Sequence, residues 1–305
     1  MSAAAAEEED AMMFCASCGT AGGDDINLKD CSACHLVKYC GAKCQKEHRS
    51  QHKKECKKRA AELRDEILFK QPESSYYGDC PICCLPLPIE PELSTMMSCC
   101  SKQICDGCNY VNKMREYEGR RQPRCPFCRS VMPITNEEID HYLAKRIEAN
   151  DPAAICHMAG VTCNKGDYRG AFEYWKKAAA LGDALSHYQL STFYYTGEGG
   201  VEKDKKKHMH HLEQAAIGGH PHARRNLGCM EETNGRMDRA AKHYIIAAKL
   251  GFDRSLENVK LLYKRGYVSK EDFAAALRGY KAAIDAIKSP QREEAAAFEK
   301  LGLGI

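Results

Sequence analysis

The chain lacks the two kinds of segment that direct a protein to or across a membrane. Its first 13 residues are rich in alanine and then acidic, without the basic and apolar regions of a secretory signal. No stretch approaches the roughly 18 consecutive apolar residues that a membrane-spanning helix needs. Because disulfides persist in oxidising compartments, we expect the 19 cysteines to be reduced and the chain to be cytoplasmic or nuclear.

The cysteines that are present concentrate in the first half of the chain. Sixteen of the 19 lie between Cys15 and Cys128, mostly in pairs with metal-ligand spacing. Zinc binds four nitrogen or sulfur ligands in a tetrahedron, so sixteen ligands predict four zinc ions. The predicted ligands are Cys15, Cys18, Cys31, Cys34, Cys40, Cys44, His52, Cys56, Cys80, Cys83, Cys99, Cys100, Cys105, Cys108, Cys125 and Cys128.

The charge of the chain does not indicate nucleic-acid binding. The formal net charge is +3, and deprotonation of the zinc-bound thiols would bring it to about −4. A basic run at residues 53–59 is interrupted by Glu55, which is typical of a solvated helix face. We therefore expect protein partners, neither nucleic acid nor membrane.

The first eight ligands follow the order Cys-x2-Cys-x12-Cys-x2-Cys-x5-Cys-x3-Cys-x7-His-x3-Cys from Cys15 to Cys56. This pattern resembles the MYND zinc finger, including Tyr39 and Gln45 beside ligands. The resemblance implies a cross-brace, a fold in which two metal sites take alternate ligand pairs. Cys15, Cys18, Cys40 and Cys44 would hold one zinc, and Cys31, Cys34, His52 and Cys56 the other.

The residues after Cys44 contain neither proline nor glycine until Pro72, which predicts a helix. His52 and Cys56 lie one turn apart on it and can reach one ion, whereas His48 is the rival ligand one turn earlier. The resemblance to MYND modules also implies binding of short proline-rich peptides. The family binds them in part through a tryptophan that follows the residue corresponding to His48. Arg49 stands there, so this chain lacks the aromatic wall that the family uses for proline.

The second eight ligands begin with Cys80-Pro-Ile-Cys83 and end with Cys125-Pro-Phe-Cys128. This arrangement resembles an all-cysteine RING finger. The resemblance implies one site formed by Cys80, Cys83, Cys105 and Cys108 and another formed by Cys99, Cys100, Cys125 and Cys128. Adjacent ligands at Cys99 and Cys100 are unusual for a RING finger, and Cys84 is a possible substitute for either. We expect both to bind and Cys84 to be a small buried apolar residue.

Resemblance to active RING ligases also implies three contacts with a ubiquitin-conjugating enzyme. The matching positions are Ile82 between the first two ligands, Pro126 after the seventh and Arg129 after the last. Such a ligase has no catalytic nucleophile of its own and accelerates transfer by restricting conformations. The alternative is that Ile82 and Pro126 only pack and that Arg129 is an ordinary surface residue, so enzyme activity stays open.

The second half contains an internal repeat. Ala-Ala-x2-Gly recurs so that its glycines are Gly182, Gly219 and Gly251, 37 and 32 residues apart. The period is that of a helical hairpin and resembles the Sel1-like repeat, with a degenerate fourth unit over residues 253–287. Cys156, Cys163 and Cys229 have no partner at ligand spacing and are expected to be core thiols. His208, His210 and His211 follow three lysines and are expected on an exposed polar face.

The sequence thus predicts small zinc-stapled α+β modules followed by an all-α helical-hairpin solenoid. The expected order is a disordered acidic N-terminus (1–14), a MYND-type finger (15–56), a helical linker (57–79), a RING-like finger (80–129), a linker helix (130–150), the solenoid (151–287) and a C-terminal tail (288–305). Such a protein is a zinc-binding interaction protein. It would be a RING-type ubiquitin ligase that holds clients with its repeats, or else a non-enzymatic scaffold.

Overall fold

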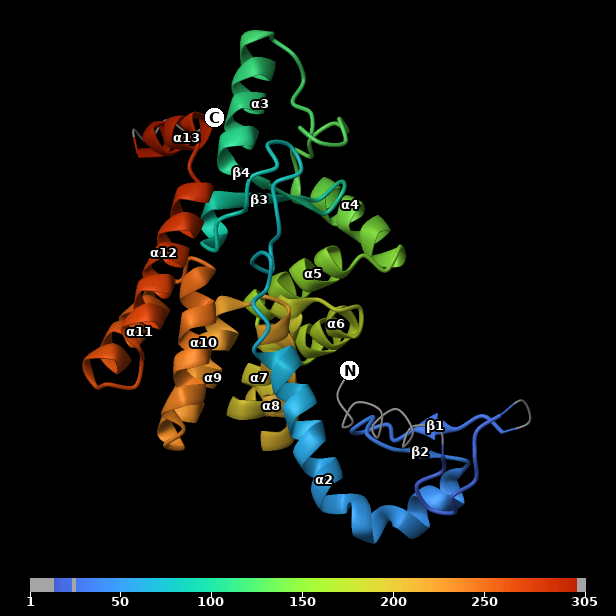
Figure 1. The fold of residues 1–305 in the computed structure, drawn as a ribbon. Coiled ribbons are helices and arrows are strands. Elements are labelled where there is room, and N and C mark those ends of the chain that lie inside the picture. The colour runs from blue at the N-terminus through green and yellow to red at the C-terminus, as the bar shows by residue number, and fades with distance from the viewer. Residues whose placement is uncertain (1–13, 24–25, 301–305) are drawn as a thin grey trace. The chain divides into compact units, whose positions relative to one another are not determined.

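The chain folds into two compact units, Met1–Lys70 and Gln71–Ile305, which are considered separately. The computed structural model describes residues 14–23 and 26–300. Of the segment predicted to be an acidic disordered N-terminus, all but Phe14 lies outside the described residues. Figure 1 shows the order of the helices and strands.

The first unit is built around one short hairpin and one long helix. Strands β1 (Lys29–Asp30) and β2 (Lys38–Tyr39) pair antiparallel, and α2 (Ala42–Leu68) follows directly. The only fully buried apolar residues that cluster in the described part of this unit are three cysteines and Tyr39. So small an interior offsets little of the chain entropy that is lost on folding.

The second unit begins with a cysteine-rich module. A 3₁₀ turn η1 (Pro91–Leu93) leads into the antiparallel hairpin of β3 (Ser94–Met97) and β4 (Lys102–Cys105), and α3 (Asp106–Glu118) follows. Leu87, Met97 and Ile104 are buried among four of the cysteines. The interior again consists largely of ligand side chains.

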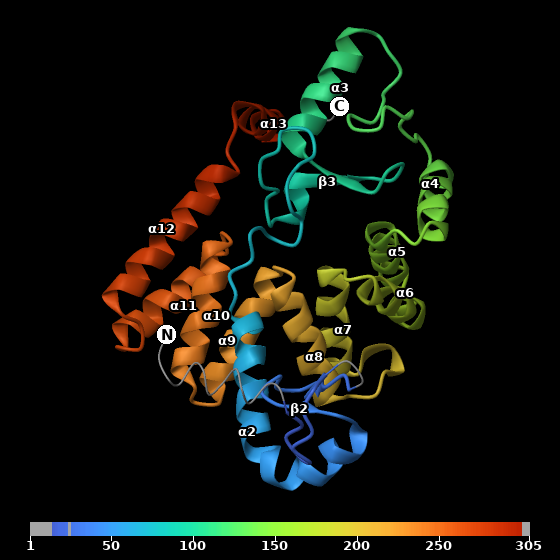
Figure 2. The same cartoon turned by 45° about the vertical axis from the view of Figure 1, so that its right-hand side comes forward.

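The rest of the second unit is helical, as Figure 2 shows. Helix α4 (Asn136–Glu148) is a single connecting helix whose first turn has a capping box between Thr135 and Glu138. The antiparallel helix pairs that follow are α5 (Pro152–Asn164) with α6 (Tyr168–Ala180), α7 (Ala184–Thr196) with α8 (Lys205–Ile217), α9 (Pro221–Thr233) with α10 (Met237–Lys249), and α11 (Asp253–Lys264) with α12 (Lys270–Ala286). A 3₁₀ turn η2 (Glu198–Gly200) lies within the second pair.

Local sequence explains where these helices begin and end. The side chains of Asp151, Asp183 and Asp204 accept backbone N–H bonds in the first turns of α5, α7 and α8. Gly182 and Gly219 follow helix ends with φ of 90° and 83°, a left-handed conformation that favours glycine. Repeated alanines with no exposed surface, among them Ala171, let neighbouring helices approach closely. The predicted fold class is confirmed.

The C-terminal segment differs from the expected tail. Residues Pro290–Lys300 form helix α13, which packs against α3 of the cysteine-rich module (Figures 1 and 2). The Phe298 and Tyr110 rings lie 5.2 Å apart between the two helices. No helix in the described part of the chain is both long enough and apolar enough to cross a membrane.

Candidate metal centres and contact surfaces

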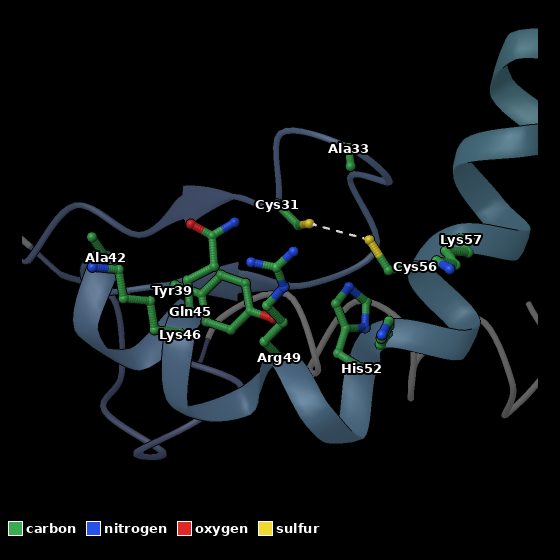
Figure 3. A pocket seen from close by; sticks show the side chains of 11 residues that line it. Cys31, Ala33, Tyr39, Ala42, Gln45, Lys46, Arg49, His52, Cys56 and Lys57 are labelled. Atoms are coloured by element: carbon green, nitrogen blue, oxygen red, sulfur yellow. Dashed lines mark hydrogen bonds between the residues drawn. The ribbon is translucent and has the colours of Figure 1, made fainter.

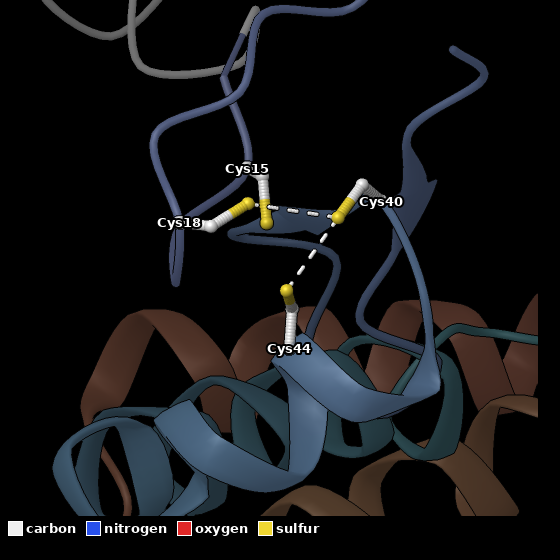
Figure 4. A group of neighbouring side chains, drawn as sticks. All are labelled: Cys15, Cys18, Cys40 and Cys44. Carbon is white, nitrogen blue, oxygen red and sulfur yellow. Dashed lines mark hydrogen bonds between the residues drawn. The ribbon is translucent and has the colours of Figure 1, made fainter.

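The first group of predicted ligands combines a turn with the start of α2, as Figure 4 shows. Cys15 and Cys18 lie on a tight turn closed by the Gly19 amide, which donates to the Cys15 carbonyl at 2.9 Å. Cys40 follows β2, and Cys44 lies in the first turn of α2. The Cys40 sulfur is 3.6 Å from that of Cys18 and 3.5 Å from that of Cys44.

Local hydrogen bonds favour the thiolate of Cys15, whereas the hydrogen bond with Cys44 raises the pKa of the Cys40 thiol. Burial by itself would raise the pKa of the Cys15 thiol, yet backbone N–H groups of Cys18, Cys40 and Ser17 lower it to about 6. A thiol that loses its proton this readily is suited to metal binding. The four sulfurs lie within 4.8 Å of one another, close enough to bind one metal ion.

The second group comprises Cys31, Cys34, His52 and Cys56. Nε2 of His52 lies 3.2 Å from the Cys34 sulfur, and the Cys31 and Cys56 sulfurs are 3.7 Å apart. His48 stays outside this group. Its ring stacks on that of His52, with centroids 5.8 Å apart, and its Nδ1 is 3.1 Å from the Tyr39 hydroxyl. His48 thus supports the ligand ring.

The remaining two groups lie in the cysteine-rich module and interleave along the chain. Cys80 and Cys83 meet Cys105 and Cys108, while Cys99 and Cys100 meet Cys125 and Cys128. Each set has its ligand atoms within 4.8 Å of one another. The sulfurs of Cys99 and Cys128 are 3.4 Å apart, and those of Cys100 and Cys125 are 3.9 Å apart.

A sharp turn lets two adjacent cysteines reach one point. The amides of Cys100 and Ser101 both donate to the Met97 carbonyl, at 3.2 and 2.7 Å, and Ser101 has a left-handed φ of 56°. The expectation for Cys84 is wrong, because it is exposed and has a left-handed φ of 55° on the first metal loop. Cys84 also belongs to none of the four ligand groups.

The donor sets fit zinc. An ion with tetrahedral bonds of 2.3 Å to sulfur holds its ligand atoms about 3.8 Å apart, close to the observed spacings. Four clustered sulfurs, or three sulfurs and an imidazole, are also the donors that zinc prefers. Bound zinc would link segments that otherwise share little apolar interior.

The predicted enzyme-contact residues lie on the loops of the cysteine-rich module. Ile82 is 41% exposed, Pro126 is half-buried and Arg129 is exposed. Nη1 of Arg129 is 3.2 Å from Oδ1 of Asn112 and 4.0 Å from a carboxylate oxygen of Glu116. Arg129 is therefore held against α3.

Glu116 is the centre of a group of arginines that the sequence did not indicate. Its carboxylate is buried and receives Nε of Arg121 at 3.0 Å and Nη2 of Arg115 at 3.4 Å. Asn112 in turn donates to the Arg124 carbonyl at 2.8 Å. The i, i+4 spacing of Asn112 and Glu116 on α3 was the available signal, but it is common on helix surfaces.

Arg292 on α13 is a second residue without a sequence signal. Its guanidinium donates to the Pro86 and Leu85 carbonyls at 2.8 and 3.4 Å and lies 3.5 Å from the Cys83 sulfur. A Cβ on Gly107 would lie 2.7 Å from the Arg292 backbone nitrogen, so only glycine permits this approach of α13. The C-terminal helix thus contacts a predicted metal ligand.

The histidines of α8 are less exposed than predicted. His211 is half-buried with its Nδ1 2.9 Å from that of His187, and Nδ1 of His208 lies 2.8 Å from the Ser191 carbonyl. Burial, together with charge repulsion from His187, His210 and Lys207, lowers the pKa of His211 to about 4. His210 alone matches the expected exposed face. Among the predicted core thiols, Cys156 is buried, whereas Cys163 and Cys229 are partly exposed.

Comparison with known families agrees with this geometry. The family model described as MYND finger matches residues 15–56, and the Sel1 repeat model matches residues 153–183, 184–220 and 221–252. The chain is accordingly a zinc-finger protein with a helical repeat array. It contains a MYND finger and three Sel1 repeats, as the sequence predicts, which are modules of kinds that bind zinc and other proteins.

Two relatives come from Schizosaccharomyces pombe. An uncharacterised Sel1-like repeat-containing protein is 25% identical over 57% of this chain and 27% of its own length. Chitin synthase regulatory factor 4 is 28% identical over 29% of this chain and 14% of its own length. The chain thus matches about a quarter or less of either relative.

Solved structures with partial similarity are also repeat proteins. A Sel1 repeat protein from Oxalobacter formigenes has a TM-score of 0.41 and 21% identity, covering 64% of this chain and 78% of that one. A protective antigen of uropathogenic Escherichia coli with an SLR fold has a TM-score of 0.32 and 13% identity, covering 64% and 52%.

Proposed function

We propose that the chain is a RING-type E3 ubiquitin ligase of the cytoplasm or nucleus, with four zinc ions. In this proposal the Sel1 repeats hold a client protein and the module at residues 80–129 recruits a charged ubiquitin-conjugating enzyme. The MYND finger supplies a further protein contact. The observation that carries the proposal is the interleaving of two four-cysteine groups in that module.

Interleaved metal groups make the intervening loops rigid. Ile82 directly precedes the ligand Cys83 and remains 41% exposed, and Phe127 lies between two ligands and is 43% exposed. A bound metal would fix the backbone on both sides of these apolar side chains. Apolar residues on a rigid loop are suited to a partner contact, because little loop entropy is lost on binding.

Arg129 would act on the bound enzyme and its ubiquitin. A guanidinium has five N–H donors, and the contact with Asn112 uses part of that capacity. The remaining donors can bridge two surfaces. By holding the thioester in a reactive geometry, such a bridge would accelerate transfer without a nucleophile from this chain.

A non-enzymatic scaffold is the second candidate, and the surroundings of Arg129 favour it. The buried carboxylate of Glu116 lies 4.0 Å from this guanidinium, so Arg129 could serve only to neutralise that charge. In a scaffold, both zinc modules and the repeats would bind proteins without promoting transfer.

The test is ubiquitination in vitro with the full zinc-loaded chain and a broad panel of conjugating enzymes. We expect self-ubiquitination with at least one enzyme, and Ile82→Ala should reduce it about tenfold or more without loss of zinc, because a central apolar contact is removed. Ile134→Ala is the matched control, since Ile134 is 81% exposed and lies outside the ligand groups. Absence of transfer with every enzyme would leave the scaffold as the function.

A further inference from the structure

A groove on the MYND finger has a charge that binding of a proline-rich peptide does not require. It has a volume of about 430 Å³ and lies between α2 and the loop that carries Cys31 (Figure 3). Four of the residues that line it are exposed cations, namely Lys46, Arg49, Lys53 and Lys57. No carboxylate lines the groove within the described residues.

These cations form one stripe because of their spacing on α2. They follow one another by three, four and four residues, which places them on the same side of the helix. Glu47 and Glu55, the nearest acidic residues on α2, fall on other sides. Within the part of the chain that the structure describes, none of the four cations forms an ion pair, so their charge is not neutralised internally.

The neighbouring metal site does not cancel this charge. Cys31, His52 and Cys56 also line the groove, and with Cys34 and zinc they would carry a net charge of about −1. Four cations outweigh that single negative charge. The residues that line the groove therefore carry an excess of positive charge.

The aromatic content argues against two other kinds of ligand. The aromatic rings among the residues that line the groove are those of Tyr39 and His52, which are only 2% and 6% exposed. Proline rings and nucleic-acid bases both bind by packing on exposed aromatic faces. The groove offers neither a wall for proline nor a platform for bases.

We infer that this groove binds an extended acidic peptide segment of a partner protein. From Lys46 to Lys57 the stripe runs about 16 Å along the helix, a length that about five extended residues span. Every second side chain of an extended peptide faces the same side, at intervals of about 6.6 Å. Carboxylates at alternate positions would therefore meet the cations, which are spaced by about one helical turn. This inference is independent of the ligase proposal.

The test measures fluorescence anisotropy of labelled nonapeptides with the full zinc-loaded chain. One peptide has glutamate at every second position with serine between, and its counterpart has glutamine in place of glutamate. We expect the glutamate peptide to bind about tenfold or more tightly, with an affinity that falls as salt increases. Equal affinity of the two peptides would overturn the inference.

A pair of double variants separates the groove from charge in general. Arg49→Glu with Lys53→Glu should weaken the glutamate peptide about tenfold or more, because both side chains line the groove. Lys54→Glu with Lys58→Glu makes the same change in net charge on a different side of α2 and should alter affinity less than about twofold. Zinc content and circular dichroism verify that both variants fold. Equal weakening by the two double variants would mean that only diffuse charge attracts the peptide, against the inference.

Two further experiments test whether the groove instead binds nucleic acid or this chain's own acidic segment. A single-stranded oligonucleotide that binds more tightly than the glutamate peptide, and loses affinity with Arg49→Glu and Lys53→Glu, would make the groove a nucleic-acid site. Deletion of residues 1–13 removes the acidic run Glu7–Asp10. If that deletion raises peptide affinity more than about threefold, the occupant is this chain's own segment and the inferred partner peptide is wrong.

Discussion

A single side chain, Arg292, joins the C-terminal helix to the first metal loop of the cysteine-rich module. Hydrogen bonds to the Leu85 and Pro86 carbonyls fix the loop, and the approach to the Cys83 sulfur places a positive charge beside a predicted thiolate. Residues that hydrogen-bond metal ligands tune metal affinity although they do not bind the ion. Arg292 is well placed for this role.

We predict that Arg292→Ala weakens zinc binding at the group of Cys80, Cys83, Cys105 and Cys108 by about tenfold. Competition with a chromogenic chelator measures this, and one zinc in four should be released earlier than from the unaltered chain. Arg278→Ala, on the exposed side of α12, is the control. Early release of all four ions would instead indicate a general loss of folding.

In the solenoid, packing between paired helices depends on small residues. Gly228 on α9 faces Tyr244 on α10, and a Cβ at Gly228 would lie 2.5 Å from the Tyr244 ring. Tyr244 has no exposed surface and donates its hydroxyl to Glu232 at 3.0 Å, so the ring cannot move without loss of that bond. Gly160 on α5 differs from Gly228, because a Cβ at Gly160 would have open space beside it.

Gly228→Ala should therefore lower the free energy of unfolding by about 1–2 kcal/mol, because overpacking exceeds the gain in helix propensity. The same substitution at Gly160 should raise it by up to about 1 kcal/mol. Urea unfolding followed by circular dichroism gives both values. If the two variants change the free energy of unfolding in the same direction, the close approach of Gly228 on α9 to Tyr244 on α10 does not limit the packing.

Local sequence patterns predict the ligand pairs and the helix ends, whereas contacts between distant segments cannot be predicted from them. Ligand pairs and the glycines at helix ends depend on neighbouring residues, so spacing alone locates them. The docking of α13 joins Arg292 to residues more than 180 positions earlier, and its polar, alanine-rich sequence resembles an exposed tail. Cys84 was wrongly expected to be buried for a similar reason, because burial depends on the whole module. The grouping of ligands across the chain came from family resemblance.

The whole molecule combines two ways of stabilising a fold. Residues 15–129 bury few large apolar side chains apart from ligands, whereas the solenoid has an interior of its own around Trp175, Ile155, Leu190 and Phe193. Metal binding should supply most of the folding free energy of the first part, and burial of apolar surface that of the second. Removal of metal should therefore affect them unequally.

We predict that the purified chain contains four zinc ions, and that a strong chelator unfolds the cysteine-rich modules while the solenoid stays folded. Trp175 is the single tryptophan of the chain and is 4% exposed within the solenoid, so its emission reports on the repeats alone. Chelation should leave that emission unshifted, while protease sensitivity rises within residues 15–129. Urea unfolding supplies the emission of the unfolded state for comparison.

Two zinc ions or fewer would contradict the pair of interleaved modules. A shift of Trp175 emission to the unfolded value on chelation would show that the repeats need metal to stay folded. The solenoid would then be held together by its contacts with the cysteine-rich half of this unit. These contacts include α13 against α3 and the Tyr76 ring, which is stacked 4.6 Å from that of His220.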